Sequence, residues 1–289
     1  MVTLGEGSTP LVRADRLSER FGVDLWLKLE GMNPTGSFKD RGMAVAVTRA
    51  LAAGAPGVVC ASTGNTAASA AAYAARAGLD CVIAHAAGAV AAGKIAQVRA
   101  VGARLLEVDG SFEDAFAASV ELAERDGYTV VNSTNPDRLE GQKTAAFEVL
   151  DELGGTPDVL ALPYGGGGNT TAYALGFAER GASLRLLPVQ AAERARTFAS
   201  AIRITAPVHS EEVETALARF GGEVVTVGED ELLDAWRLVA REEGVFCEPA
   251  SAAGIAAVAR GGVDPGARVV CVLTGHGLKD PGAVELLDR

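Results

Sequence analysis

Residues 159–170 read VLALPYGGGGNT: a short apolar run, four consecutive glycines and a polar pair that leads into a helical stretch. The apolar run predicts a buried strand, and the stretch that starts at Thr170 predicts a helix. Four glycines allow successive backbone N–H groups to converge, and the positive end of a helix dipole adds to their potential. The segment is neither a GxGxxG fingerprint nor a P-loop, because no GK[ST] follows. We interpret Gly165–Asn169 as a phosphate-binding loop, with a merely flexible loop as the alternative.

The rest of the chain alternates β-branched runs with Ala-rich helical stretches. This alternation indicates βαβ units and parallel sheets covered by helices on both faces. The expected strands are Gly57–Ala61, Cys81–Ala84, Arg104–Val108, Thr129–Asn132, Val159–Leu162, Leu184–Val189, Val224–Val227 and Arg268–Leu273. The expected helices are Thr66–Ala77, Lys94–Val101, Phe112–Arg125, Gly141–Leu153, Thr170–Arg180, Asp230–Glu243 and Ala250–Ala259. Ligands of such sheets gather at the carboxyl ends of the strands, in the loops that lead into helices.

Residues 33–42, NPTGSFKDRG, place a lysine in such a loop. Pro34 and Gly36 favour a turn, and Lys39 precedes an apolar helical stretch at residues 43–51. A cation at the start of a helix is disfavoured by the helix dipole, so Lys39 should lose its proton more easily. A neutral amine is what Schiff-base formation requires. The alternative is a solvated surface lysine.

Two further strand ends carry hydroxyl and amide groups. Ser62, Thr63, Asn65 and Thr66 follow the strand that ends near residue 61, and they can face a carboxylate at the start of a helix. Thr274 follows the strand 268–273, where a hydroxyl can meet a ring nitrogen. An ordinary helix cap is the alternative for both segments.

Length and composition exclude several classes of protein. The 289 residues are enough for about two domains. Lys and Arg number 26 against 37 Asp and Glu, a net charge of −11, which disfavours binding to nucleic acid or to an anionic membrane. The first ten residues lack a basic region and an apolar region, so we expect no signal peptide and a cytoplasmic protein. We expect a small-molecule substrate, no nucleic acid partner and no membrane partner.

The four cysteines and three histidines show no metal-ligand spacing, so we expect no metal. No CxxC pair is present, and three of the cysteines lie in apolar, strand-like runs. We expect all four to be small buried hydrophobes in a reducing compartment. They are Cys60, Cys81, Cys247 and Cys271.

Taken together, these segments resemble the pyridoxal-phosphate-dependent enzymes of fold type II, the tryptophan synthase beta-like family, and among them the threonine synthase family. The resemblance runs almost from end to end. The motifs that carry it are GEGSTPL (5–11), NPTGSFKDRG (33–42), STGNT (62–66), NSTNPDRLEGQK (132–143), EPASAA (248–253) and VLTGHGLKD (272–280). The lysine segment and the run from Asn135 to Lys143 are the most discriminating, whereas the wider fold type shares the glycine loop.

The resemblance implies roles for individual residues. Lys39 would be the Schiff-base lysine and the catalytic base, and Asn65 would hydrogen-bond the ring hydroxyl of pyridoxal 5'-phosphate. The glycine loop, Gly165, Gly166, Gly167, Gly168 and Asn169, would hold the cofactor phosphate, and Thr274 would face the pyridine nitrogen. Substrate binding would fall to two sets of side chains. Ser62, Thr63 and Thr66 would bind the α-carboxylate, and Asn132, Ser133 and Arg138 would bind a substrate phosphate.

The activity implied is a lyase reaction of threonine biosynthesis: O-phospho-L-homoserine and water give L-threonine and phosphate. A deaminating lyase that acts on threonine or serine is the alternative enzyme, because it shares the fold and the lysine segment. A non-catalytic relative that binds pyridoxal phosphate is the alternative from another class, and the intact Lys39, Asn65 and Thr274 disfavour it.

Two departures from the family pattern concern the substrate. The glycine loop of the family usually has an asparagine that contacts the substrate phosphate, where this chain has Gly166. The segment between Val189 and Ala201 is shorter than usual. Losing one hydrogen bond to a charged group costs about 1.5–3 kcal/mol, so affinity for a phosphorylated substrate is expected to fall unless Arg194 or Arg196 compensates.

The resemblance also implies the fold class and its division. We expect an α/β protein of two domains, each a mainly parallel twisted sheet flanked by helices, with the cofactor in the cleft between them. Residues 1–33 and 131–289 would form the large cofactor-binding domain, and residues 34–130 a small mobile domain. A homodimer is usual for this fold, and we expect one here.

Overall fold

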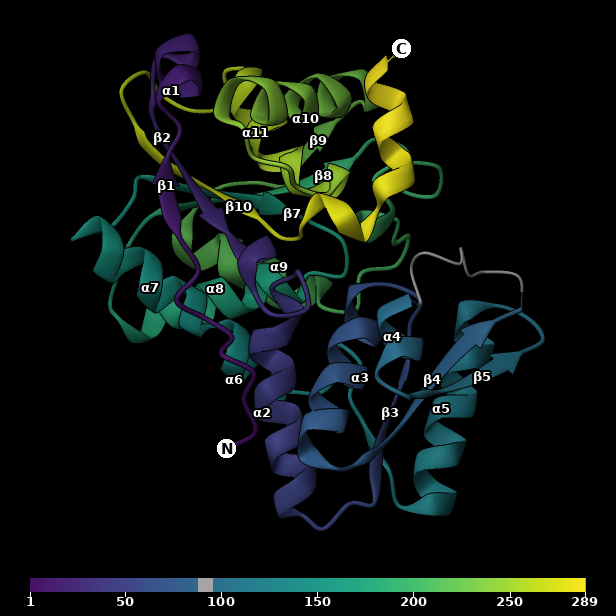
Figure 1. The fold of residues 1–289 in the computed structure, drawn as a ribbon. Coiled ribbons are helices and arrows are strands. Elements are labelled where there is room, and N and C mark those ends of the chain that lie inside the picture. The colour runs from purple at the N-terminus through teal and green to yellow at the C-terminus, as the bar shows by residue number, and fades with distance from the viewer. Residues whose placement is uncertain (88–95, 289) are drawn as a thin grey trace. The chain divides into compact units, whose positions relative to one another are not determined.

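The computed structural model describes residues 1–87 and 96–288. The chain divides into two compact units (Figure 1). Unit 1 comprises Met1–Glu6 and Asn33–Gln142, and unit 2 comprises Gly7–Met32 and Lys143–Arg289. The domain boundaries expected at 33/34 and 130/131 stay a prediction, because a mobile domain is defined by its motion.

Unit 1 is built on a parallel four-stranded sheet with the order β5-β4-β3-β6. Residues of α2, α3 and α4 pack with those of β3 and β4 in one apolar cluster. Ala115 of α5 packs against Ala61 and Ala84 in a second cluster. The strands are β3 (Gly57–Ala61), β4 (Asp80–Ala86), β5 (Arg104–Val108) and β6 (Thr129–Val130). The helices are α2 (Lys39–Ala52), α3 (Asn65–Ala77), α4 (Ala96–Ala100), α5 (Phe112–Asp126) and α6 (Asp137–Gln142).

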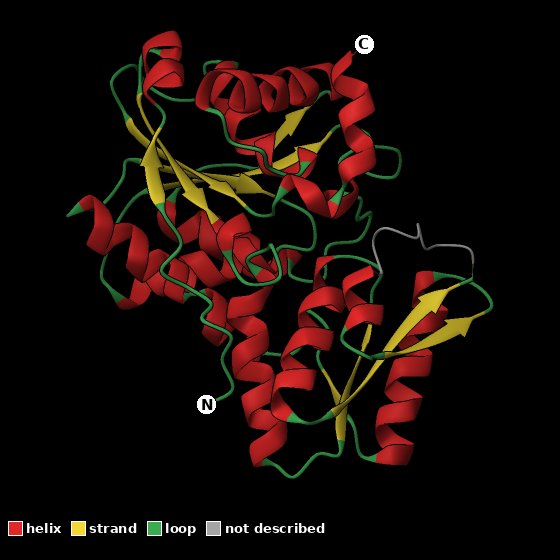
Figure 2. Cartoon of the chain, viewed as in Figure 1, coloured by secondary structure: helices red, strands yellow, loops and turns green. Residues whose placement is uncertain are grey.

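Unit 2 is built on a six-stranded sheet with the order β1-β2-β10-β7-β8-β9, parallel except for the edge pair β1 and β2. Helices cover both faces of this sheet, with α10 and α11 on one face and α7 and α8 on the other (Figure 2). The strands are β1 (Leu11–Arg13), β2 (Asp24–Leu29), β7 (Val159–Pro163), β8 (Arg185–Ala191), β9 (Val225–Val227) and β10 (Arg268–Leu273). The α-helices are α1 (Asp15–Phe21), α7 (Thr144–Leu153), α8 (Gly168–Glu179), α9 (Ser210–Phe220), α10 (Glu229–Glu243) and α11 (Ala253–Ala259). The 3-10 helices are η1 (Glu30–Met32), η2 (Ser200–Ile202), η3 (Pro249–Ala252), η4 (Gly277–Lys279) and η5 (Pro281–Asp288).

Strand β10 shows why the central strands read as continuous apolar runs. Val269, Cys271 and Leu273 pack into the cluster beneath α10 and α11, whereas Val270 and Val272 pack into the cluster beside α7 and α8. Because both faces of a parallel sheet are buried, neither face needs polar residues. The predicted α/β class with parallel sheets is confirmed.

All eight predicted strands are present, to within a few residues at their ends. The prediction missed β1 and β2, and in β2 the polar residues Asp24 and Lys28 interrupt the apolar pattern. Lys28 is nevertheless fully buried: its Nζ donates to the Thr9 carbonyl (2.6 Å) and pairs with Glu148 (2.9 Å) and Glu152 (2.6 Å). Three well-placed oxygens compensate for the loss of hydration that would otherwise exclude this charge.

The predicted helices are confirmed with two corrections and two omissions. Gly141–Leu153 was expected as one helix, but α6 ends at Gln142 and α7 begins at Thr144. The stretch expected to start at Ala250 begins as the 3-10 helix η3, with Pro249 at its first turn. Helices α1 and α9 were not predicted, and Lys94, the predicted start of α4, lies outside the described residues.

The four cysteines are free and buried, as predicted. Burial raises the pKa of each thiol, that of Cys60 to about 12. Among residues 1–87 and 96–288, no helix is long and apolar enough to cross a membrane. The same residues contain no cluster of His, Cys, Asp and Glu that could hold a metal ion.

Candidate active site

Lys39 is the first residue of α2, in unit 1, and a tight turn presents it. Gly36 N–H donates to the Asn33 carbonyl (2.8 Å), and Gly36 has φ +89°, a conformation that glycine adopts without strain. The Lys39 Nζ lies 4.4 Å from the centroid of the Phe38 ring. The amine is thus half-buried beside an aromatic face at the amino end of a 14-residue helix.

Asp40, which the sequence analysis missed, holds this turn in place. Its carboxylate is fully buried and accepts hydrogen bonds from the backbone N–H and the hydroxyl of Thr35, each at 2.6 Å. It also accepts one from the hydroxyl of Ser69 in α3 (2.6 Å). Asp40 therefore joins the turn that presents Lys39 to the helix that begins at Asn65. In the sequence, the position of Asp40 directly after Lys39 could have indicated this role.

The loop after β3 carries the predicted carboxylate-binding residues. Ser62 Oγ accepts a hydrogen bond from Gly64 N–H (3.2 Å), and Asn65 is the first residue of α3. Asn132 lies after the neighbouring strand β6 and clamps the end of β3, since its side chain accepts from Ala61 N–H and donates to the Ala61 carbonyl, both at 3.0 Å. The observed contacts of Asn132 thus fix the position of the Ser62 loop.

Arg138 is the most unusual side chain of unit 1. It is fully buried, and its Nη1 donates to the Val131 carbonyl at 3.3 Å, but its Nε and Nη2 have no hydrogen-bond partner among residues 1–87 and 96–288. Burial lowers the pKa of the guanidinium to about 10, so it stays charged at neutral pH. A buried cation with two unpaired nitrogens is costly unless an anion compensates it. This arrangement suits a phosphate ligand.

Two glycines fix Arg138 against α2. A Cβ on Gly141 would lie 2.0 Å from the Arg41 carbonyl oxygen, and one on Gly42 would lie 2.6 Å from the Arg138 carbonyl oxygen. Helices α2 and α6 therefore touch backbone to backbone at these positions. The close approach explains why the lysine segment has a glycine at residue 42 and why the run 132–143 has one at residue 141. It also places Arg138 next to the helix that begins with Lys39.

In unit 2, the glycine loop connects β7 to α8. Three successive carbonyl groups of this loop accept hydrogen bonds. The Gly165 carbonyl accepts from Arg194 Nη1 (3.2 Å), the Gly166 carbonyl from His209 N–H (3.0 Å), and the Gly167 carbonyl from Thr171 N–H (3.0 Å). C=O and N–H of a trans peptide point in opposite directions. The N–H groups of Gly166, Gly167 and Gly168 therefore point away from these partners, as an anion-binding loop requires.

Two side chains at the start of α8 support the same interpretation. Asn169 Nδ2 and Thr170 Oγ1 are buried and have no hydrogen-bond partner within the described part of the chain. They belong to the first turn of a 12-residue helix, where the backbone N–H groups are also unpaired within the helix. A phosphate group would satisfy these donors. The loop and the helix start fit the phosphate of pyridoxal phosphate.

Thr274 follows β10, the strand beside β7, so both segments leave the sheet at the same edge. The Thr274 hydroxyl lies 3.1 Å from Ser251 Oγ and 3.4 Å from the buried carboxylate of Glu248. Ser251 Oγ also accepts from Gly275 N–H (3.0 Å). Ser251 and Glu248 belong to the EPASAA motif, so this motif positions the hydroxyl predicted to face the cofactor ring.

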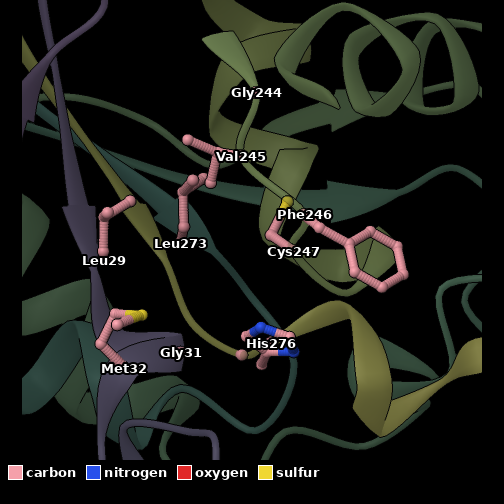
Figure 3. A pocket seen from close by; sticks show the side chains of 10 residues that line it. Leu29, Gly31, Met32, Gly244, Val245, Phe246, Cys247, Leu273 and His276 are labelled. Carbon is pink, nitrogen blue, oxygen red and sulfur yellow. The ribbon is translucent and has the colours of Figure 1, made fainter. Parts of the chain in front are cut away.

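A separate cavity of about 280 Å³ lies behind this strand end (Figure 3). Leu29, Val245, Phe246, Leu273 and His276 are among its lining residues, and none of the residues predicted to bind cofactor or substrate lines it. Its walls are mostly apolar, and His276 Nδ1 accepts from Leu278 N–H (3.1 Å). The cavity lacks the convergent polar groups of the glycine loop and is not the candidate site.

Each unit thus brings together part of the predicted set. Unit 1 contains Lys39, Ser62, Thr63, Asn65, Thr66, Asn132, Ser133 and Arg138, and unit 2 contains Gly165, Gly166, Gly167, Gly168, Asn169 and Thr274. Asp40, Glu248 and Ser251, which orient these groups, were not predicted from the sequence. Arg194 was predicted only as a residue that could compensate for Gly166.

The chain is similar to known proteins over nearly its whole length. The family model described as pyridoxal-phosphate-dependent enzyme matches residues 2–275. Threonine synthase of Halalkalibacterium halodurans is 47% identical over 97% of this chain and 85% of the relative. Threonine synthase of Mycobacterium tuberculosis is 49% identical over 97% and 84%, and that of Methanocaldococcus jannaschii is 42% identical over 98% and 78%.

Solved structures share the fold at lower sequence identity. Threonine deaminase isoform 2 from Solanum lycopersicum has a TM-score of 0.86 and 24% identity, covering 97% of this chain and 82% of its own. The fungal L-serine ammonia-lyase from Rhizomucor miehei has a TM-score of 0.86 and 20% identity, covering 98% of both chains. These likenesses show the fold, and the more similar sequences show the family. The chain therefore belongs to the pyridoxal-phosphate-dependent enzymes and, within them, to the threonine synthase family.

Proposed function

We propose that this protein converts O-phospho-L-homoserine and water to L-threonine and phosphate, with pyridoxal 5'-phosphate as its cofactor. The observation that carries the substrate assignment is Arg138: a buried, charged guanidinium with two nitrogens that have no hydrogen-bond partner among the described residues. A phosphorylated substrate supplies a dianion for these nitrogens, and a guanidinium fork suits a tetrahedral phosphate. Serine and threonine, the substrates of the alternative deaminating lyase, carry no such group.

The residues that would hold the cofactor are those that the family resemblance implies. Lys39 would provide the amine for covalent attachment, Asn65 would bond the ring hydroxyl, Gly165–Asn169 would bind the phosphate, and Thr274 would face the ring nitrogen. When bound, pyridoxal phosphate withdraws electrons from the substrate carbons next to its amine and so acidifies their protons. The unpaired donors of Asn169 and Thr170 support the phosphate position.

Lys39 is the base in this proposal. Once the substrate amine has displaced Lys39, the released Nζ of Lys39 accepts the proton from the substrate Cα. Loss of a proton from Cβ then expels phosphate from Cγ together with the bridging oxygen, and a proton added at Cγ forms the methyl group. Water adds its oxygen at Cβ, which gives the threonine hydroxyl, and return of a proton to Cα completes the product. Asp40 keeps the amine in place throughout, because it ties the lysine turn to α3.

Substrate orientation depends on the remaining residues of unit 1. Ser62, Thr63 and Thr66 would bind the α-carboxylate at the amino end of α3, where the helix dipole favours an anion. Asn132 and Ser133 would assist Arg138 in binding the phosphate. The contacts of Asn132 with Ala61 support a role in holding the carboxylate loop near this second set.

Product analysis separates the proposed reaction from the alternatives. The purified, cofactor-loaded protein is incubated in parallel with O-phospho-L-homoserine, L-threonine and L-serine. We expect equal yields of threonine and phosphate from the first compound and no turnover of the others. A 2-oxo acid and ammonia from threonine or serine would support the deaminating lyase. Absence of turnover in all three, with cofactor bound, would support the non-catalytic alternative.

We also propose that the protein works in the cytoplasm as a homodimer and that residues 34–130 move as a domain. These proposals rest on the family resemblance. Light scattering during size-exclusion chromatography should give about twice the 29.5 kDa mass of the chain. Hydrogen exchange with and without substrate should change most within residues 34–130.

A further inference from the structure

Residues 190–209, which comprise the last two residues of β8 and the segment that follows it, lie along the outer side of the glycine loop. A Cβ on Gly165 would lie 3.2 Å from Ile204 Cδ1 and 3.3 Å from the Ala201 carbonyl oxygen. His209 N–H donates to the Gly166 carbonyl (3.0 Å). Part of this segment, Gln190–Ser200, is the stretch that is shorter here than is usual in the family.

Arg194 is the side chain that joins this segment to the loop. Its Nη1 donates to the carbonyls of Gly165 (3.2 Å) and Ile204 (2.9 Å), and its Nε donates to Gln190 Oε1 (2.9 Å). Its guanidinium carbon lies 4.7 Å from the centroid of the buried Tyr164 ring. One planar group thus connects Gln190 at the end of β8, Gly165 of the glycine loop and Ile204 of the segment after β8. A lysine, whose charge is a single flexible point, could not make these three contacts together.

We propose that Arg194 is a positioning residue for the phosphate-binding loop and that it makes this loop selective for a phosphorylated cofactor. By holding the Gly165 carbonyl on the outer side, Arg194 fixes the orientation of the Gly165–Gly166 peptide. The Gly166 N–H then points to the opposite side, where an anion meets it. Arg194 also adds a positive charge next to the loop, which opposes the acidic net charge of the chain.

This inference rests on the proposed cofactor site, and the test keeps the two apart. The full chain, freed of cofactor, is titrated with pyridoxal 5'-phosphate and with pyridoxal, which lacks the phosphate; absorbance reports binding. We expect the wild-type protein to prefer the phosphorylated compound strongly. If it binds both equally, the proposed cofactor site itself is wrong.

Two substitutions then test Arg194. Arg194→Gln should weaken binding of pyridoxal 5'-phosphate by about tenfold, because the Gly165 carbonyl loses the charge-assisted hydrogen bond that orients the Gly166 N–H, and it should leave pyridoxal binding unchanged. Arg194→Lys keeps the charge but not the planar fork, so it should lose affinity to a similar extent. The control is Arg196→Gln, which removes an exposed arginine of the same segment and should bind like wild type.

Three results would overturn the proposal while leaving the cofactor site intact. The first is an Arg194→Gln protein with wild-type preference for the phosphorylated compound. The second is equal weakening for pyridoxal and pyridoxal 5'-phosphate, which indicates general damage to the unit. The third is full recovery by Arg194→Lys, which would show that charge alone acts.

Discussion

The two sheets use different chemistry at the carboxyl ends of their strands. In unit 1, the candidate groups are side chains: Lys39 at the start of α2, and the buried, partly unpaired guanidinium of Arg138. In unit 2, they are mainly backbone N–H groups of the glycine loop, oriented by partners on its carbonyls. Side-chain groups can be removed one at a time, whereas backbone groups depend on glycine conformation. Substitutions in the two regions should therefore fail in different ways.

The largest effect is expected at Lys39. Lys39→Ala removes both the attachment amine and the base, and a positioned base contributes about 10²–10⁴-fold to a rate. We expect threonine formation to fall by at least this factor while the circular dichroism spectrum stays native. Borohydride reduction of the wild-type protein followed by peptide mapping should find the cofactor on the Lys39 peptide. Cofactor on Lys28 or Lys143 instead would contradict the assignment.

Arg138→Leu should affect function and stability in opposite directions. Loss of charge-assisted hydrogen bonds worth about 1.5–3 kcal/mol should lower kcat/KM for O-phospho-L-homoserine by about 10–100-fold. The free protein should unfold at the same or a higher temperature, because a buried charge with unpaired donors is replaced by an apolar side chain. Steady-state kinetics and calorimetry measure the two effects.

A matched control for Arg138 is Arg125→Leu, which removes an exposed arginine paired with Asp126. We expect neither kcat/KM nor the unfolding temperature to change much, since exposed pairs contribute about 0–1 kcal/mol. If Arg138→Leu instead unfolds the protein and leaves the KM of the folded fraction unchanged, Arg138 is a structural cation and not a phosphate ligand.

In unit 2, two adjacent glycines should respond differently to alanine. Gly167 has φ +90°, and a Cβ there would lie 3.0 Å from the His209 carbonyl oxygen. Strain of about 1–2 kcal/mol should weaken binding of pyridoxal 5'-phosphate by about tenfold. A Cβ on Gly166 meets nothing closer than 3.7 Å, so Gly166→Ala should bind the cofactor normally. Equal affinities of the two variants would show that the backbone of the loop is not the phosphate site.

The smallest effect is expected from restoring the family residue at this position. Gly166→Asn has space for its Cβ and returns the amide that usually contacts the substrate phosphate. One added hydrogen bond of about 1 kcal/mol should lower the KM for O-phospho-L-homoserine about fivefold. Cofactor affinity should not change. A raised KM would mean that the loop of this chain has adapted to its glycine.

Much of the fold was predictable because both faces of the central strands are buried. Runs such as 268–273 contain only apolar residues after the first, so their identity as strands did not depend on periodicity. Strand β2 was missed for the opposite reason: Lys28 is buried but polar, and its partners Glu148 and Glu152 lie more than 100 residues away. Long-range compensation of this kind leaves no local pattern.

Site residues could be predicted where their residue type indicates the chemistry. Residues whose role depends on three-dimensional contacts could not be predicted in this way. Lys39 and the glycine run could be recognised from residue type and spacing. The role of Asp40 depends on its hydrogen bonds to Thr35 and Ser69, and that of Gly141 on a 2.0 Å approach of the Arg41 carbonyl. Arg194 could be named as a candidate, but only its contacts with Gly165 and Ile204 show what it holds.

Oxygen-18 from water distinguishes addition of water to the substrate carbon from hydrolysis of the phosphate ester. The cofactor-loaded protein converts O-phospho-L-homoserine in water enriched in oxygen-18, and mass spectrometry locates the label in both products. The account predicts one labelled oxygen in the hydroxyl of threonine and none in phosphate, because the bond between Cγ and oxygen breaks and water adds at Cβ. Label in phosphate together with homoserine, or formation of a 2-oxo acid in place of threonine, would contradict it.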